Sequence, residues 1–318
     1  YAYRAAQQAL VEAMERRGYH GHFDFLDGFR GYQVRINLKN TDDLVSIIIP
    51  TKNKQDYLTK CIESITKLST YKNYEIILID NNSDEKGFFK AVDKWKNQTN
   101  FKFKVVRDEK SFNFARLMNV GRANASGKYL ILLNNDTEVI TSDWIEGMME
   151  HAQRPEIGVV GCKLLYDDDT IQHAGVIVGI AGVASHAFIG DDRDGPGYFN
   201  YINLLNNYSS LTAACIMMRT EVYDKAKGFS EEFVVEYNDV DFCLKVLEEG
   251  YRNLYVPHVE LYHYESISRG HPHATSESYK RHVKEVNKFR KKWMKYIDHD
   301  PCYNPNLSLG TEHFNINI

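Results

Sequence analysis

The stretch YLILLNNDTEVI, residues 129–140, decides the fold of this chain. Its first five residues are apolar or aromatic, and two amides and two acids follow within the next five positions. A short, continuous apolar run is typical of a strand that is buried on both faces of a parallel sheet. We therefore expect residues 129–134 to form a central strand whose end carries Asn134, Asn135 and Asp136.

Two other runs have the same character and predict two further strands of that sheet. They are VSIIIP at 45–50 and YEIILID at 74–80. Helical patterns separate the runs, at residues 56–68, 84–97 and 113–124. Strands that alternate with helices form βαβ units, so we predict an α/β fold with a mostly parallel central sheet and helices on both faces.

The remaining segments are predicted from their periodicity. Residues 1–20 read as a helix, and residues 21–42 as an irregular connector with a short extended piece. The elements expected after the third strand are a helix from Trp144, strands at 158–165 and 211–218, an irregular insertion at 166–210, and helices at 239–250 and 274–297. The apolar residues that recur at helical spacing in the last helix are Val283, Val286, Trp293 and Ile297.

Composition restricts the class of protein. The 318 residues are 43% hydrophobic with a formal net charge of −4, which suits a globular protein and gives no electrostatic case for nucleic-acid binding. Five widely spaced cysteines without a C-x-x-C pair favour a reducing compartment. The sequence shows no signal peptide and no apolar run near the roughly 20 residues that span a bilayer. We expect a cytoplasmic location, and the start at Tyr1 indicates either a segment of a longer polypeptide or a trimmed chain.

Polar side chains follow all three predicted strands, namely Thr51, Asp80 and Asp136. In open α/β sheets, ligands bind beyond the carboxyl ends of the strands. A carboxylate on a rigid strand end suits Mg²⁺ or Mn²⁺, which take oxygen ligands from one or two carboxylates and from substrate phosphates. Alternatively, Asp136 serves only to form a turn and to cap the helix that begins at Trp144. This stretch alone leaves both interpretations, cation ligand and turn former, open.

Two later clusters add candidate site residues. In VVEYNDVDFCL, Asp239 and Asp241 stand at a predicted helix start, where acids complement the helix dipole and where Asp239 is also a candidate general base. In VELYHYESISRG, His263 either packs in the core or joins the cation, and Arg269 has the geometry to clamp a diphosphate. The histidines of this region fit no structural zinc pattern.

Five motifs together resemble the family 2 glycosyltransferases with the GT-A fold. They are VSIIIPTKN, YEIILIDNNSD, FNFARLMNVGRANASGKYLILLNNDTEVI, YNDVDFCLKVLEEGYR and HYESISRG. The stretches IQHAGVIVG, LTAACIMMR and DPCYNPNLSLG are similar to the bacterial subgroup that builds O-antigens and other cell-surface polysaccharides, in which rhamnosyltransferases are frequent. The resemblance implies a GT-A domain at 43–270, with an N-terminal helix and connector at 1–42 and a basic amphipathic helix and tail at 271–318.

The resemblance also implies roles for individual residues. The D-x-D motif of the family falls on Asn134, Asn135 and Asp136, so only Asp136 keeps a carboxylate, and His263 would join it as a ligand of Mn²⁺ or Mg²⁺. The E-D pair falls on Asn238 and Asp239, which leaves Asp239 as the base. The donor nucleotide and its diphosphate would be held by Pro50, Thr51, Asn53, Asp80, Asn82, Asn134, Asn135, Ser266 and Arg269. The substrate contacts would be Trp144, His173, Thr212 and Asn238, with Lys128 and Gln172 near the site.

The mechanism that the resemblance implies is a single displacement with inversion. The acceptor hydroxyl attacks the anomeric carbon while Asp239 removes its proton, and the nucleoside diphosphate leaves from the opposite face. The cation and Arg269 would stabilise the charge that builds on the leaving phosphate. The expected donor is a dTDP- or UDP-linked sugar, and the expected acceptor is a glycan or a lipid-linked glycan.

Other functions are weighed against this one. A dinucleotide-dependent oxidoreductase needs G-x-G-x-x-G after the first strand, and a nucleotidyltransferase usually has a glycine-rich basic loop there, whereas this chain has PTKN. The change at Asn134 motivates a degenerate, non-catalytic nucleotide-sugar-binding domain within a larger polysaccharide-assembly protein. The retention of Asp136, Asp239 and His263 argues against that alternative.

The basic helix at 280–295 has two interpretations. Its cationic side chains are Lys280, Arg281, Lys284, Lys288, Arg290, Lys291, Lys292 and Lys295. These cations, together with Phe289 and Trp293, would allow a peripheral contact with an anionic membrane at the inner face of the cell membrane. The alternative is an ordinary helix that packs its apolar stripe on the main domain.

Overall fold

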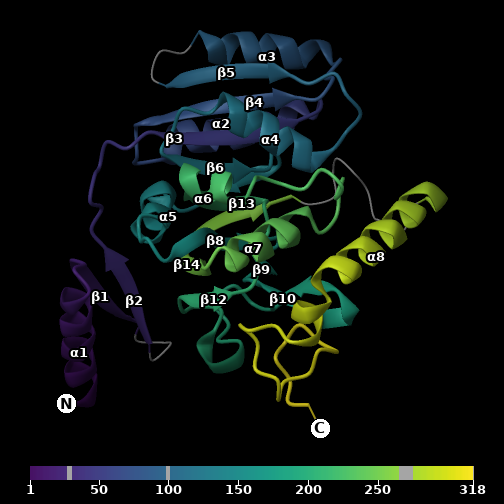
Figure 1. Cartoon of the computed structure of the whole chain (residues 1–318). Coiled ribbons are helices and arrows are strands. Elements are labelled where there is room, and N and C mark those ends of the chain that lie inside the picture. The colour runs from purple at the N-terminus through teal and green to yellow at the C-terminus, as the bar shows by residue number, and fades with distance from the viewer. Residues whose placement is uncertain (27–30, 98–100, 265–274, 318) are drawn as a thin grey trace.

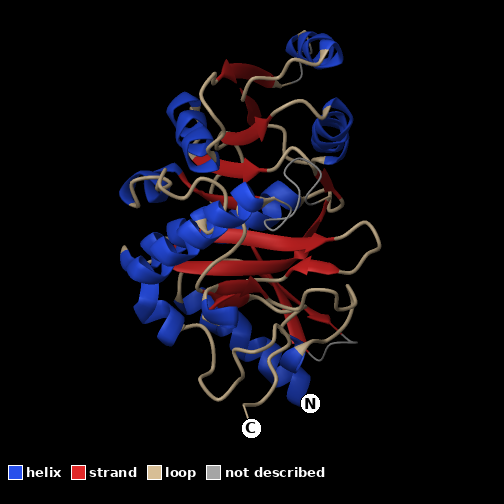
Figure 2. Cartoon of the chain, turned by 90° about the vertical axis from the view of Figure 1, so that its right-hand side faces the viewer, coloured by secondary structure: helices blue, strands red, loops and turns tan. Residues whose placement is uncertain are grey.

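The computed structural model describes residues 1–26, 31–97, 101–264 and 275–317. A mixed sheet of ten strands forms the centre of the described chain, and helices cover both of its faces (Figures 1 and 2). Its strands are β3 (Val45–Thr51), β4 (Tyr74–Asp80), β5 (Lys102–Arg107), β6 (Tyr129–Leu133), β7 (Thr137–Val139), β8 (Ile157–Leu165), β9 (Ile171–His173), β12 (Asn206–Tyr208), β13 (Cys215–Arg219) and β14 (Arg252–His263). Their order is β12-β14-β8-β13-β6-β3-β4-β5, with β7 paired to β14 and β9 paired to β8.

Three of the strands predicted from sequence, β3, β4 and β6, form the parallel half of this sheet together with β5, which was not predicted. β6, β3, β4 and β5 are neighbours and run parallel. Successive side chains of a strand point to opposite faces, so Ile47 and Ile49 enter one hydrophobic core while Ile48 enters the core on the other face. Because both faces are covered, apolar side chains occupy most positions on either face, and the strands read as nearly continuous apolar runs.

Six helices divide between the two cores. One core is covered by α2 (Gln55–Leu68), α3 (Lys86–Lys96) and α5 (Trp144–Ala152). The other is covered by α4 (Phe114–Asn124), α6 (Thr220–Lys225) and α7 (Asn238–Glu248). Local chemistry sets some of the ends: the side chain of Asn113 caps α4 by accepting from the Arg116 N–H at 3.0 Å. Gly250, which follows α7, takes the left-handed φ of +87° that glycine adopts readily.

One reversed strand determines which strand ends meet. β13 runs antiparallel to β6 on one side and to β8 on the other. β8 and β14 are parallel to each other, so both run in the direction of β6 and β3. The carboxyl ends of β3, β6 and β14 therefore lie at one edge of the sheet, although they come from distant parts of the sequence.

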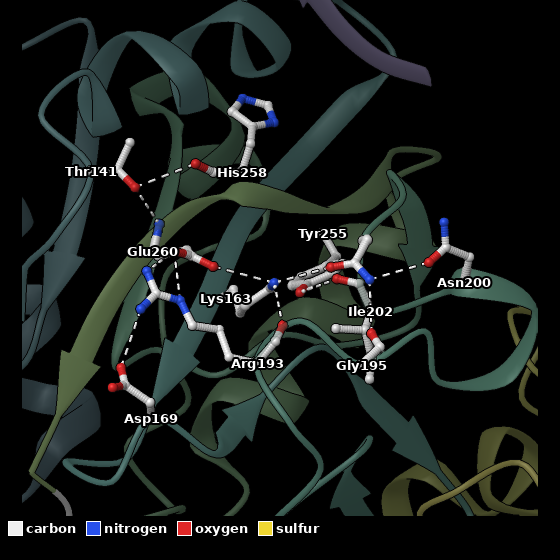
Figure 3. Close-up of polar contacts among 11 residues, drawn as sticks. Thr141, Lys163, Asp169, Arg193, Gly195, Asn200, Ile202, Tyr255, His258 and Glu260 are labelled. Atoms are coloured by element: carbon white, nitrogen blue, oxygen red, sulfur yellow. Dashed lines mark hydrogen bonds and ion pairs between the residues drawn. The ribbon is translucent and has the colours of Figure 1, made fainter. Parts of the chain in front are cut away.

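The insertion between β8 and β13 is fixed to the sheet by a buried cation. It contains β9, β12 and a small hairpin of β10 (Val176–Val178) and β11 (Ala184–His186). The Lys163 ammonium lies 3.3 Å from a Glu260 carboxylate oxygen and donates to the Arg193 carbonyl at 3.1 Å and to Asn203 at 3.4 Å (Figure 3). Burial lowers the pKa of Lys163, and Glu260 opposes that shift. The network holds loop 187–206 against β8 and β14.

The N-terminal residues differ from the expected irregular connector. After α1 (Ala2–Arg16), residues 21–36 form an antiparallel hairpin of β1 (Gly21–Leu26) and β2 (Gly31–Ile36), separate from the main sheet. This hairpin has a small core of its own. Most of its strand residues are only half-buried, so its sequence lacks a clear apolar alternation. It contacts α5 mainly through polar groups: the Arg35 guanidinium lies 2.6 Å from Glu150 and 2.7 Å from Asp143.

The predicted C-terminal helix forms as α8 (Ser276–Asp298). Its apolar stripe is buried against β10, α7 and the loop before α7, and consists of Val286, Phe289, Trp293 and Ile297. Val283, which the helical spacing had included, is instead 39% exposed. Because the stripe packs inside the protein, the apolar face is not available to a lipid surface.

Candidate active site

A cavity of about 550 Å³ lies where the carboxyl ends of β3, β6 and β14 meet the start of α7. Nine of the predicted site residues line it: Pro50, Thr51, Asn134, Asn135, Asp136, Thr212, Asn238, Asp239 and His263. Gln172, expected near the site, also lines it. The separate turns predicted from the sequence therefore converge on one cavity.

The short strand β7 brings Asp136 and His263 together. Thr137 of β7 pairs with His263 at the end of β14, and the Tyr264 N–H donates to the Asp136 carbonyl at 2.9 Å. This pairing places Asp136 Oδ1 3.3 Å from His263 Nε2, and both residues are buried. Among residues 1–26, 31–97, 101–264 and 275–317, none donates a hydrogen bond to Asp136 Oδ1. A buried carboxylate oxygen without a donor calls for a positive charge beside it.

Gln172 on β9 sets the tautomer of His263. The Gln172 amide donates to the His263 backbone carbonyl at 3.0 Å, so its carbonyl oxygen faces the imidazole, 2.6 Å from Nδ1. Nδ1 must therefore carry the proton and donate it to Gln172. Nε2 is then the ring atom next to Asp136 Oδ1, and it accepts from the Asn134 amide nitrogen at 3.2 Å. A second ligand atom is thus oriented toward the same place.

Asp136 and His263 fit a divalent cation. Two neighbouring ligands of an octahedral cation with bonds of about 2.1 Å lie about 3 Å apart, which agrees with the 3.3 Å between Asp136 Oδ1 and His263 Nε2. The described residues include no group of three or more His, Cys, Asp or Glu side chains that could hold a metal. A cation here would need further ligands from phosphate oxygens and water, in line with the usual Mg²⁺ site.

The two asparagines beside Asp136 keep the turn in place. The Asn135 amide donates to the Thr51 hydroxyl at 3.0 Å, which links the end of β6 to the end of β3. The Asn134 backbone N–H donates to the Ala214 carbonyl at 2.9 Å. Because residues 134 and 135 are asparagines, the turn at 134–136 carries a single carboxylate, that of Asp136.

Asp239 is held in the first turn of α7, on the cavity wall. One of its carboxylate oxygens accepts from the Ala213 N–H at 3.1 Å and the other from its neighbour Val240 N–H at 2.9 Å. The preceding residue, Asn238, donates to the Val235 carbonyl at 2.7 Å. These backbone contacts fix the position of the carboxylate on the cavity wall.

Helix α8 fixes the loop that leads into α7. Glu285 is 2% exposed, and its carboxylate accepts from the backbone N–H groups of Val234 at 3.0 Å, Glu236 at 2.7 Å and, more distantly, Val235 at 3.4 Å. The Glu236 carboxylate pairs with His282, one turn earlier on the same helix. A buried carboxylate thus anchors the residues that precede Asp239.

Three predicted nucleotide contacts hold the turns beside the cavity instead of lining it. Asp80 is buried, accepts from the Ser83 N–H at 2.9 Å and pairs with Arg107 at 2.9 Å. Asn53 bonds Asp84 through its side chain, and the Asn82 amide donates to the Glu109 carbonyl at 2.9 Å. Their polar atoms face these partners in the free protein. The neighbour of two of them, Asn81, lines the cavity.

Three other residues lie away from the cavity wall. Trp144 is fully buried in the core, where its indole donates to Ser69 at 2.8 Å, so it is a core residue and not a sugar contact. His173 is buried behind the wall, with its ring centroid 4.8 Å from that of His186. Lys128 precedes β6 at the opposite end of the strand and pairs with Asp43 at 2.7 Å. Ser266 and Arg269 lie outside the described residues.

Several residues of the wall were not singled out by sequence. His186 donates from Nδ1 to the Gln172 carbonyl at 3.0 Å, which leaves its other ring nitrogen as an acceptor. Glu236 and Tyr237 precede Asp239, and Arg281 comes from α8. His186 lies in the insertion, Glu236 and Tyr237 lie just before α7, and Arg281 lies in the C-terminal helix; nothing in the sequence distinguishes these single residues from ordinary surface residues. The cavity is therefore built from more parts of the chain than the strand ends alone.

Comparison with known proteins agrees with this site. The profile of the family described as "Glycosyl transferase family 2" matches residues 46–226. The chain is 42% identical over 275 residues to the uncharacterized protein y4gI of Sinorhizobium fredii, covering 85% of this chain. It is 33% identical over 318 residues to the O-antigen biosynthesis protein RfbC of Myxococcus xanthus, covering 97% of this chain. The chain spans only 30% and 24% of the length of these two relatives.

Two solved structures share the fold at 16% sequence identity. One is the mannosyltransferase PcManGT from Pyrobaculum calidifontis in complex with GDP-Man and Mn²⁺, with a TM-score of 0.57 over 92% of this chain and 73% of that one. The other is GalNAc-T7 with UDP, GalNAc and Mn²⁺, with a TM-score of 0.62 over 85% of this chain and 53% of that one. The predicted GT-A fold is confirmed. None of the helices in the described part of the chain combines the length and apolar character needed to cross a membrane.

Proposed function

The chain belongs to glycosyl transferase family 2, and on that premise we propose that it transfers a sugar from a nucleoside-diphosphate sugar to a hydroxyl group of a glycan. The proposed acceptor is a growing cell-surface polysaccharide or a lipid-linked glycan, in keeping with the name of the O-antigen biosynthesis relative. A dTDP- or UDP-linked sugar is the proposed donor. The cytoplasm, where nucleotide sugars are made, is the proposed location.

One observation carries the proposal: a single cavity is lined by the Asp136–His263 pair and by Asp239. The Asp136–His263 pair offers a carboxylate oxygen and an imidazole nitrogen to a cation that binds phosphates. Asp239 offers a carboxylate for a proton. A reaction that joins an alcohol to a diphosphate-activated sugar needs both groups at one place. This arrangement supports a catalytic domain over a degenerate binding domain.

Asp136 and His263 are the residues that would hold Mn²⁺ or Mg²⁺, and the bound cation would neutralise charge on the diphosphate. Gln172 keeps His263 in the tautomer with its lone pair toward that place. Both structural neighbours are described with Mn²⁺. We assign Ser266 and Arg269 to the diphosphate on the strength of the family resemblance.

Asp239 is the proposed general base. Its carboxylate, held by the Ala213 and Val240 N–H groups, accepts the proton of the acceptor hydroxyl as that oxygen attacks the anomeric carbon. A single attack of this kind inverts the anomeric configuration. The buried anchor at Glu285 keeps the loop before Asp239 from moving during the attack.

A donor screen tests the proposal. The protein is incubated with dTDP-, UDP- and GDP-sugars, Mn²⁺ and candidate glycan acceptors, and release of nucleoside diphosphate is measured. We expect release with one donor, and the same donor should give a product of inverted configuration by NMR. Asp239→Asn should reduce turnover at least about 100-fold with little change in affinity for the nucleoside diphosphate. The control is Asp298→Asn, an exposed acid at the end of α8.

The outcomes separate the two candidate functions. A non-catalytic domain would bind a nucleotide sugar but release no diphosphate with any acceptor. Equal loss of turnover and of nucleotide affinity in Asp239→Asn would contradict its assignment as base.

A further inference from the structure

Arg281 is a cation of the cavity wall. It belongs to the second turn of α8 and lines the cavity together with Glu236 and Tyr237. Its Nε atom is buried and has no hydrogen-bond partner in the part of the chain that the structure describes. Among the described residues, its guanidinium forms no ion pair within 4.0 Å, in contrast to Arg35, Arg107, Arg116 and other arginines of the chain. A buried donor of this kind calls for an acceptor that the protein itself does not supply.

The neighbourhood of Arg281 is rigid. Glu285 lies one turn further along the same face of α8, and its carboxylate binds the backbone of residues 234–236. His282, the next residue, pairs with Glu236. The helix is therefore attached at two points just after Arg281, His282 and Glu285, to the loop that forms this part of the wall. The guanidinium is held at the cavity by the fold and does not depend on an exposed, mobile side chain.

The charges of the cavity suggest what Arg281 binds. The described carboxylates of the lining are Asp136, Glu236 and Asp239, and the described lysines and arginines of the lining are Lys52 and Arg281. A diphosphate placed among three carboxylates is repelled unless cations lie beside it. Guanidinium groups bind phosphate oxygens through two parallel N–H bonds, which a free Nε donor permits.

From these observations we infer that Arg281 binds the diphosphate of the nucleotide sugar. This inference rests on the proposed transferase function, because it is that reaction which brings a diphosphate into the cavity. It makes the C-terminal helix a part of the donor site. The cation at Asp136 and His263 and the guanidinium of Arg281 would then share the negative charge of the leaving group.

The test compares Arg281→Ala and Arg281→Lys with Lys284→Ala. Lys284 is an exposed cation three residues further along α8, and its removal changes the net charge by the same amount. Each protein is titrated calorimetrically with UDP, dTDP and GDP in the presence of Mn²⁺, and with the corresponding nucleosides. We expect Arg281→Ala to weaken binding of the preferred nucleoside diphosphate about 10- to 100-fold. Arg281→Lys should lose less, and Lys284→Ala should bind like the wild type.

The nucleosides identify the part of the ligand involved. Affinity for the nucleoside should be the same in wild type and Arg281→Ala, because no phosphate is present. A nucleoside diphosphate affinity in Arg281→Ala within twofold of that of Lys284→Ala would overturn the inference. Equal losses for nucleoside and nucleoside diphosphate would also overturn it. A wild-type protein that binds none of the three diphosphates would contradict the proposed function itself.

Discussion

The anchor at Glu285 gives the sharpest prediction, because the structure specifies what its removal leaves behind. In Glu285→Ala, the backbone N–H groups of Val234 and Glu236 lose acceptors at 3.0 Å and 2.7 Å, and the Val235 N–H loses a weaker one at 3.4 Å. Glu285 is 2% exposed, so water reaches these groups poorly. An unsatisfied buried donor destabilises a protein by about 1–3 kcal/mol. We expect the free energy of unfolding to fall by about 3 kcal/mol.

The measurement is urea denaturation of Glu285→Ala, Glu285→Gln and Lys284→Ala. Glu285→Gln keeps the shape of the side chain and one acceptor, so it should lose about half as much stability. Lys284→Ala, an exposed neighbour, should change stability by less than about 0.5 kcal/mol. In both Glu285 variants, turnover should fall further than nucleoside diphosphate affinity, because the loop leads to Asp239.

Two results would refute this reasoning. A loss below about 0.5 kcal/mol in Glu285→Ala would show that the three N–H groups find other partners. Unchanged turnover in a destabilised Glu285→Gln would show that the anchor serves stability alone and does not position Asp239.

Three further predictions concern other parts of the chain. In Gln172→Leu, Nδ1 of His263 loses the acceptor that fixes its tautomer. Mn²⁺-dependent nucleotide binding, measured by calorimetry, should weaken about 10-fold or more. Unchanged Mn²⁺ dependence would contradict the tautomer argument. Burial lowers the pKa of His151 to about 3 and that of His258 to about 4. Both are neutral in the folded protein, so stability is complete above pH 6.5 and falls below it as the unfolded chain takes up protons, by about 2 kcal/mol per histidine at pH 5. Denaturation of His151→Gln at pH 7 and pH 5 should show a smaller loss than wild type, and an equal loss would exclude His151 as a cause. Arg35→Ala removes the cation beside Glu150 and leaves it the Ile36 N–H at 3.0 Å, and trypsin should release residues 1–36 faster than from wild type, whereas an unchanged cleavage rate would show that the ion pairs do not hold the hairpin.

The central strands could be predicted because burial on both faces leaves a clear trace in sequence. β3, β4 and β6 are continuous apolar runs, and their observed bounds agree with those expected to within one residue. The parallel half of the sheet and the helices between its strands follow from those runs. The turn at 134–136 was recognisable because polar residues follow such a strand directly.

Other features depend on pairings that a single sequence does not show. β7 and β9 have three residues each, too few for a periodic pattern, yet they bring His263 and Gln172 to Asp136. Trp144 follows a turn near the site, but the direction of its side chain is decided by packing on α2 and α5. Arg281 was one of eight basic residues on a helix, and the structure distinguishes it by the absence of a partner in the described chain.

The attachment of α8 has a consequence for the order in which the chain completes its fold. β3 and β6 are synthesised well before residues 276–298, whereas β14 ends at His263, shortly before α8 begins. The loop before Asp239 acquires its buried carboxylate only when α8 docks. A nascent chain without α8 therefore lacks these acceptors for the backbone N–H groups of Val234 and Glu236.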